Sequence, residues 1–328
     1  MLRKGLITAM TSRNLVFVAV LLPAMTAAQA QTFPSKPVRV VVPFAAGGGA
    51  DIIARVMAQK LTDAWGQQVI VDVRAGGGSV VGTEIVARSA PDGYTLLYAA
   101  NPFSTNAALL ANLPYDSLRD FAPITMVASA PLIVVVHPSL PARSIKELIA
   151  IAKTRPGQLS YGTSGNGGPQ HLAGELFKSM AGVDMVHVPY KGGAPATTDL
   201  VGGQIQIGFN SMVTVLPFVK SGRLRPLAVT SSQRTTSMPE LPTIAESALA
   251  GYEAMTWWGI LARAGTPAAT IGALNTEIVR VLKSQEIRDR FEGTGEVVAN
   301  SPAAFAAFLQ AEIERVRKLS KSTTIKLD

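Results

Sequence analysis

The sequence contains no cysteine among its 328 residues. This absence excludes disulfide bonds, thiol nucleophiles and thiolate metal sites together. Histidine is also scarce, because His137, His171 and His187 are the only three, and none belongs to the H-E-x-x-H pattern of zinc proteases. The composition therefore predicts neither a metal site nor a cofactor, and it gives no support to an enzyme that depends on either.

Charged residues are few as well. Only 16% of the residues are charged, whereas 48% are hydrophobic, so the chain can bury one large core or two ordinary ones. The net charge is +8, but Lys and Arg occur singly, without the basic cluster or interleaved aromatic residues that nucleic-acid binding needs. We therefore expect no nucleic-acid partner, while a modest positive field favours anionic solutes.

The N-terminus lacks an apolar run long enough to span a membrane. Its run LVFVAVLL (15–22) is well short of the ~20 residues that a span requires. Basic residues precede this run, and the small residues AQA (28–30) follow it, as in a secretory signal. The pattern predicts a signal peptide over residues 1–30, cleaved after Ala30, and a periplasmic protein. A membrane anchor and a start at Met10 are the alternatives.

Short β-branched runs alternate with helical periodicity through the rest of the chain. This alternation indicates an α/β fold with mostly parallel sheets, and the number of units favours two lobes joined by crossing strands. Two further helices are expected in 266–293 and 301–322. The expected strands are 38–44, 68–73, 94–100, 132–138, 159–163, 185–190, 205–210 and 224–230, and the helices between them include 51–65, 144–155, 169–181 and 194–202.

Two glycine-rich loops stand between a strand and a helix. The first glycine loop, AAGGGA (45–50), precedes a helix from Asp51, and the second glycine loop, SGNGG (164–168), precedes a helix from Pro169. A helix N-terminus offers unpaired N–H groups and a positive dipole end, and glycine allows a ligand to approach closely, so both loops are candidate anion sites. Neither has the G-x-G-x-x-G or phosphate-loop spacing of a nucleotide site. Plain turns with Asp51 and Ser164 as helix caps are the alternative.

Catalytic motifs are incomplete. The run GTSGNG (162–167) resembles a nucleophile elbow, but Asn166 occupies the position where G-x-S-x-G requires glycine. His171, in the first turn after the second glycine loop, either donates to a bound anion or packs on the helix, whereas His137 and His187 are expected to be structural. Asn210 ends a strand and points toward the expected cleft. Trp257 and Trp258 face opposite sides of a strand, which places one in the core and the other at the cleft or hinge.

Seven segments in register resemble the Bug-type solute receptors of the tripartite tricarboxylate transporter family. They cover essentially the whole mature chain and comprise PVRVVVPFAAGGGADIIAR, APDGYTLLYA, YGTSGNGGPQHLAGELF, VHVPYKGGAPATTDLVGGQ, GRLRPLAVTS, LPTIAESALAGYEAMTWWGILA and AGTP. The resemblance implies a periplasmic-binding-protein fold of two lobes, with lobe 1 formed by 31–131 and 232–328 and lobe 2 by 132–231. It also implies a monomer that delivers a small carboxylate to membrane permease subunits.

The resemblance assigns ligand contacts to particular residues of this chain. They are Phe44, Ala46, Gly47, Gly48, Gly49, Ala50 and Asp51 in the first lobe, and Ser164, Gly165, Asn166, Gly167, His171 and Asn210 in the second. Three positions depart from the family pattern: Ala50 replaces a common Thr, Val73 an Asn, and Arg263 a Pro. The first two make the first lobe less polar, which favours an aromatic or less polar carboxylate.

The sequence therefore predicts a solute-binding protein without chemistry of its own. A sensor protein that feeds a signalling system would have the same cleft and a different partner. An exported hydrolase is a remote third class, because the nucleophile motif is incomplete.

Overall fold

The computed structural model describes residues 33–46, 49–291 and 295–322. The predicted signal peptide (1–30) and two predicted contact residues, Gly47 and Gly48, lie outside the described residues. Of the described helices, none combines the length and the apolar character that crossing a membrane requires.

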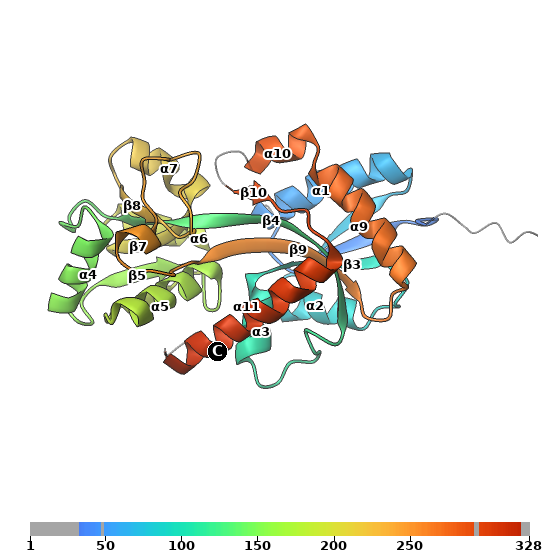
Figure 1. Cartoon of the computed structure of the whole chain (residues 1–328), viewed down its shortest axis with the longest axis horizontal. Helices are drawn as coiled ribbons and strands as arrows, with labels where there is room; N and C mark the ends of the chain where they lie inside the picture. Colours follow the sequence, from blue (N-terminus) through green and yellow to red (C-terminus); the bar gives the residue numbers. More distant parts are fainter. Residues whose placement is uncertain (1–32, 47–48, 292–294, 323–328) are drawn as a thin grey trace, which may run out of the picture. The chain divides into compact units, whose positions relative to one another are not determined.

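Within the described residues, ten strands form one curled sheet in the order β2-β1-β3-β9-β4-β7-β5-β6, with β8 and β10 also paired to β4. Figure 1 shows β4 and β9 running along its middle. The strands are β1 (Val38–Val42), β2 (Val69–Val73), β3 (Thr95–Ala100), β4 (Phe121–Val136), β5 (Ser160–Thr163), β6 (Val186–Pro189), β7 (Ile207–Ser211), β8 (Arg225–Val229), β9 (Met255–Arg263) and β10 (Glu296–Val297).

Parallel pairing is confined to the two outer groups of strands. β1 pairs in parallel with β2 and β3, and β5 pairs in parallel with β6 and β7. β4 and β9 instead run antiparallel to each other and to their other neighbours. The expectation of mostly parallel sheets thus holds for each outer group and not for the strands that connect them.

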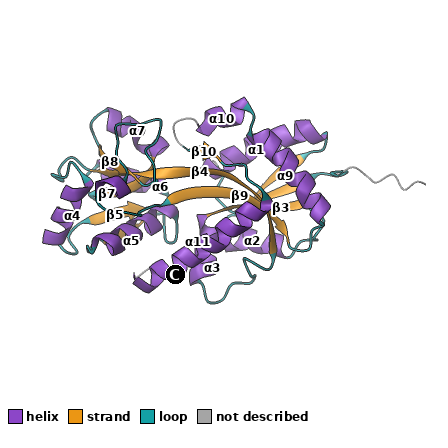
Figure 2. Cartoon of the chain, viewed as in Figure 1, coloured by secondary structure: helices purple, strands orange, loops and turns teal. Residues whose placement is uncertain are grey.

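Helices cover both faces of the sheet (Figure 2). They are α1 (Gly49–Trp65), α2 (Val80–Ala87), α3 (Asn101–Leu109), α4 (Ile145–Thr154), α5 (Pro169–Ala181), α6 (Gly193–Val201), α7 (Met212–Lys220), α8 (Ile244–Ser247), α9 (Ala268–Leu282), α10 (Gln285–Phe291) and α11 (Pro302–Ser322), with a short 3₁₀ helix η1 (Gly77–Ser79) before α2.

Alternate residues of β1 face different helical layers, which explains why four of its five residues are valine. Val38, Val40 and Val42 belong to a core cluster with residues of α1 and α9. Val41 instead belongs to a cluster with residues of α2, α3 and α11. Because successive side chains of a strand point to opposite faces, a strand covered on both faces is mostly apolar, and Arg39, the polar residue of β1, is half-buried and pairs with Asp72.

The 16-residue strand β4 connects the two parts of the sheet. Its first half pairs with β9 and β10, and its second half pairs with β7 and β8. Val134 and Val136 in its second half pack with residues of α4 and α5, whereas Ile133 and Val135 pack with residues of α6 and α7. One strand therefore belongs to hydrophobic cores in both parts of the fold.

All eight expected strands are present, and the expected α/β class is confirmed. The structure adds α2, α3 and α7, and it extends β4 upstream from residue 132 to Phe121. The sequence pattern misses α3 because its residues NPFSTNAAL include few apolar side chains at helical spacing. This short helix nevertheless turns out to be part of the candidate site.

Candidate functional site

A cavity of about 270 Å³ lies where residues from distant parts of the chain meet. The first glycine loop and α1 contribute to it from one part of the sequence, and the second glycine loop and α5 from another. Its lining residues are Phe44, Ala50, Ala100, Asn101, Pro102, Ser164, Gly165, Asn166, Gly168, Pro169, Thr256 and Trp258. All of these residues are uncharged.

Three helices begin at this cavity. Ala50 is in the first turn of α1, Asn101 is the first residue of α3, and Pro169 is the first residue of α5. The first N–H groups of a helix have no partner within the helix, and the helix dipole places a partial positive charge there. Three helix N-termini at one cavity therefore form an environment that favours an anion without a basic side chain.

A second cavity, of about 370 Å³, shares Pro102, Ser164, Gly165 and Asn166 with the first. Its other lining residues are Gly77, Gly78, Asn106, Leu110 and Gly167. The loop from Gly76 to Ser79 has four successive residues at positive φ, a conformation that glycine accepts readily and serine rarely. This loop follows Val73, one of the three departures from the family pattern.

The second glycine loop uses several of its own N–H groups inside the protein. Ser164 N donates to Gln170 Oε1 (3.1 Å), Gly165 N to Thr163 Oγ1 (3.3 Å) and Gly167 N to His171 Nδ1 (3.1 Å). These three N–H groups are therefore engaged within the protein, whereas the first-turn N–H groups of α5 after Pro169 have no partner within the helix.

Five predicted contact residues line the first cavity: Phe44, Ala50, Ser164, Gly165 and Asn166. Gly167 lines the second cavity, and Gly49 begins α1. The two glycine loops, which are more than a hundred residues apart in the sequence, are thus brought to one site.

Besides Gly49, four described residues of the predicted set line neither cavity. Ala46 is exposed, and Asp51 is buried, with Oδ1 2.9 Å from Arg55 Nε, one helical turn further along α1. Asp51 is the third residue of α1 and not its N-cap, and as an acidic residue in the first turn it stabilises the helix through the helix dipole. Asn210 is 4% exposed and its Nδ2 lies 3.4 Å from Thr197 Oγ1 on α6. His171 is also 4% exposed and lies behind the second glycine loop.

Asn101 is a site residue that the sequence interpretation missed. It is 1% exposed, its Nδ2 donates to Met255 O (3.0 Å), and its Oδ1 accepts from Trp257 N (3.1 Å). These two bonds fix the start of α3 against β9, so Asn101 holds a helix N-terminus at the cavity. The Asn-Pro pair directly after a predicted strand was a signal for this helix start.

The two neighbouring tryptophans separate as predicted. Trp257 is fully buried, in T-shaped contact with Phe305 and Phe308, whereas Trp258 lines the cavity. Because side chains alternate along β9, one ring enters the core and the next reaches the site.

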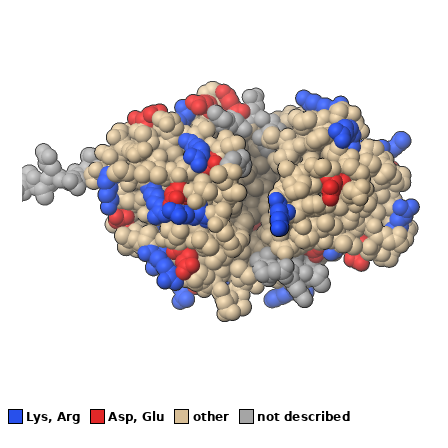
Figure 3. Space-filling model, turned by 180° about the vertical axis from the view of Figure 1, so that it is seen from behind, with Lys and Arg blue, Asp and Glu red and all other residues tan. Residues whose placement is uncertain are grey.

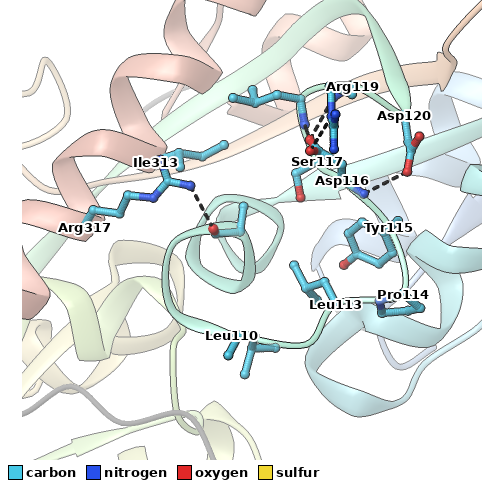
Figure 4. A pocket seen from close by; sticks show the side chains of 13 residues that line it. Leu110, Leu113, Pro114, Tyr115, Asp116, Ser117, Arg119, Asp120, Ile313 and Arg317 are labelled. Carbon is cyan, nitrogen blue, oxygen red and sulfur yellow. Dashed lines mark hydrogen bonds and ion pairs between the residues drawn. The ribbon is translucent and has the colours of Figure 1, made fainter.

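A larger hollow, about 710 Å³, lies elsewhere, between the loop 110–120 and α11 (Figure 4). Its charged side chains already have partners: Arg119 Nε lies 2.8 Å from Asp116 Oδ2, and Arg317 Nη2 donates to Ala107 O (3.3 Å). Basic side chains are also dispersed over the face shown in Figure 3, which a groove crosses near its middle. The convergence of helix N-termini makes the smaller cavity the better anion site.

The model of the family described as "Tripartite tricarboxylate transporter family receptor" matches residues 53–325. The chain belongs to this receptor family. Protein BugT of Bordetella pertussis is 38% identical over 301 residues, which cover 91% of this chain and 92% of BugT. The receptor has the two-lobed fold of periplasmic binding proteins, as its sequence indicated.

Solved structures of receptors agree with this assignment. Rpa4515 of R. palustris, solved with adipate, is 36% identical and has a TM-score of 0.80, with coverage of 89% of this chain and 99% of that one. MatC of Rhodopseudomonas palustris, solved with bound malate, is 28% identical with a TM-score of 0.76, over 88% of this chain and 99% of MatC.

Proposed function

We propose that this receptor captures a small carboxylate between its two glycine loops. The observation that carries the proposal is the convergence of the N-termini of α1, α3 and α5 on one cavity with an uncharged lining. Helix N-termini stabilise an anion through backbone N–H groups, and an enclosed site strengthens each such interaction. The adipate and malate bound by related receptors support the same ligand class.

The two loops belong to separate lobes in this proposal, with lobe 1 at 31–131 and 232–328 and lobe 2 at 132–231. The core clusters support the first boundary, because Leu132 packs with second-lobe residues and Ala128 with first-lobe residues. For the second boundary the clusters favour a position after Tyr252 instead of after residue 231, since Ile244 and Tyr252 also pack in the second-lobe core. Closure of the lobes would surround the anion, so the ligand selects the closed state.

Export and delivery complete the proposed function. A signal peptide cleaved after Ala30 places the receptor in the periplasm, where it acts as a monomer and passes its ligand to membrane permease subunits. The receptor performs no chemistry on the ligand. Membership of a transporter receptor family supports the transport partner over a signalling partner.

The test is a thermal-shift screen of the mature protein against adipate, malate, benzoate and their neutral amides. A ligand that binds only the folded state raises the melting temperature by mass action. We expect at least one carboxylate to raise it in a concentration-dependent way, and its amide to have no comparable effect.

Calorimetry of the best carboxylate then gives its affinity. Stabilisation by sugars or cations, with no effect of any organic acid in a broader panel, would overturn the proposal.

A further inference from the structure

Two imidazole rings lie stacked behind the second glycine loop. The rings of His171 and His187 have centroids 3.9 Å apart and planes 10° apart. His171 is in α5 and His187 in β6, so the stack joins a helix to an edge strand. Tyr161 of β5 also stacks on His187, with centroids 5.1 Å apart. Three elements of the second lobe thus meet at this stack.

Each imidazole is connected to the second glycine loop. Gly167 N donates to His171 Nδ1 at 3.1 Å, a direct bond to the loop backbone. His187 Nε2 lies 2.7 Å from Thr163 Oγ1, which in turn donates to Gly165 O at 3.0 Å. We assign the single hydrogen of the threonine hydroxyl to Gly165 O, which can only accept, and this assignment makes the imidazole the donor in its bond to Thr163. His171 is therefore an acceptor at Nδ1, and His187 is a donor at Nε2.

We propose that His171 and His187 are positioning residues that hold the second glycine loop in its ligand-binding conformation. The inference rests on the proposed function, because it assigns these side chains to one of the two proposed ligand loops. Gly165 and Gly167 have φ values of 134° and 71°, so the loop has a conformation available mainly to glycine. A glycine-rich segment loses much conformational entropy when it is ordered, and bonds that order it before the ligand arrives improve affinity.

The role of His171 requires an uncharged ring, because only then does Nδ1 accept a hydrogen bond. Burial lowers the pKa of His171, and burial together with the neighbouring His171 lowers the pKa of His187 to about 4. A proton on His171 Nδ1 would remove the acceptor for Gly167 N. Glu175 and Lys178 also face the rings, and these two residues pair with each other at 2.8 Å. His171 Nδ1 therefore remains a hydrogen-bond acceptor for Gly167 N at neutral pH.

The sharpest test compares a substitution that keeps the hydrogen bond with one that keeps only the ring. His171→Asn retains an acceptor near the position of Nδ1, whereas His171→Phe retains an aromatic ring that cannot accept. At the other position, His187→Gln retains a donor near Nε2 and His187→Phe does not. We expect each Phe variant to bind the best carboxylate about tenfold more weakly than the wild type, and each amide variant to stay within about threefold.

Tyr161→Phe is the matched control. It removes the hydroxyl that donates to Glu175 Oε1 at 2.7 Å, in the same network but without a bond to the loop. We expect it to lower the melting temperature and leave the affinity unchanged, which separates loop positioning from general loss of stability.

Amide hydrogen exchange at Gly165 and Gly167 without ligand provides a readout that does not depend on binding. We expect faster exchange at Gly167 in His171→Phe and unchanged exchange in His171→Asn. Equal affinities and equal exchange rates in the Phe and amide variants would overturn the inference. A wild-type protein that binds no carboxylate would instead overturn the proposed function, and the exchange experiment would still test the loop.

Discussion

Because all residues that line the first cavity are uncharged, a single charge introduced there has a large effect on the binding of an anionic ligand. Asn166 is exposed and belongs to the lining of both cavities, so its amide can be replaced by a carboxylate of the same shape. Two like charges about 5 Å apart repel each other by about 3 kcal/mol at an effective dielectric constant near 20. Such a carboxylate therefore weakens the binding of an anionic ligand and leaves the binding of a neutral ligand unchanged.

Asn166→Asp is therefore expected to weaken carboxylate binding by at least about tenfold at low salt, with little change in melting temperature. Asn112→Asp is the control, because Asn112 is also exposed and lines neither cavity. Isothermal calorimetry with both variants measures the difference. Equal affinities for the two would contradict an anion bound beside the second glycine loop.

Two helical glycines differ in the space around them. A Cβ on Gly174 in α5 would lie 2.3 Å from Tyr161 Cε2, whereas a Cβ on Gly272 in α9 would meet nothing within 4 Å. Gly174→Ala is expected to lower the free energy of unfolding by about 1 to 3 kcal/mol through overpacking. Gly272→Ala is expected to raise it by about 0.5 to 1 kcal/mol through helix propensity. Urea denaturation of both variants tests the pair, and a stable Gly174→Ala variant would contradict the close packing of α5 on β5.

At the scale of elements, the molecule depends on how strands pass between its two parts. Thr230 directly follows β8, is fully buried, and connects two other segments. Its Oγ1 accepts from Leu132 N in β4 at 2.7 Å and lies 2.6 Å from Ala254 O, just before β9. The hydroxyl of Thr230 thus connects β4 and the residue before β9 to the end of β8, at the point where the sheet passes from one hydrophobic core to the other.

Thr230→Val is expected to lower the free energy of unfolding by about 1 to 3 kcal/mol, because buried backbone groups lose their partner. Thr214→Val is the control: Thr214 is exposed, and its hydroxyl donates only within its own turn, to Ser211 O. Its effect should stay within about 0.5 kcal/mol. Chemical denaturation compares the two, and equal values would show that the connection at Thr230 is dispensable.

At the scale of the whole molecule, the buried histidines link stability to pH. Burial and the neighbouring His171 lower the pKa of His187 from 6.5 to about 4. The unfolded chain then binds a proton more readily than the folded chain between these two values. The contribution of His187 is fully present above about pH 6.5 and is lost as the pH falls toward 4. Of the groups that face it, Lys178 lowers the pKa further and Glu175 opposes the change.

The free energy of unfolding of the wild type is therefore expected to decrease between pH 7 and pH 4.5. His187→Gln should show a smaller decrease, since it removes the titrating group and keeps a donor to Thr163. Urea titrations at three pH values measure both slopes. Identical slopes would show that other groups control the acid sensitivity.

The sequence by itself determined the elements that its patterns specify locally. Runs with apolar residues on both sides, such as VRVVV, favour strands covered on both faces, and the Gly-rich turns before α1 and α5 mark strand-to-helix junctions. The α/β class and the two glycine loops follow from these patterns. Strand alternation predicts that one of Trp257 and Trp258 reaches the cleft or hinge, and the structure shows that Trp258 lines the cavity.

Only the tertiary structure decided which groups meet. The N-terminus of α3 reaches the cavity because Asn101 bonds to Met255 and Trp257, more than 150 residues away in the chain. The stack of His171 on His187 likewise forms only once α5 packs beside β6, although these two residues are closer in the chain. Local sequence specifies backbone conformation, but hydrogen bonds between distant segments are fixed only when the sheet has brought those segments together.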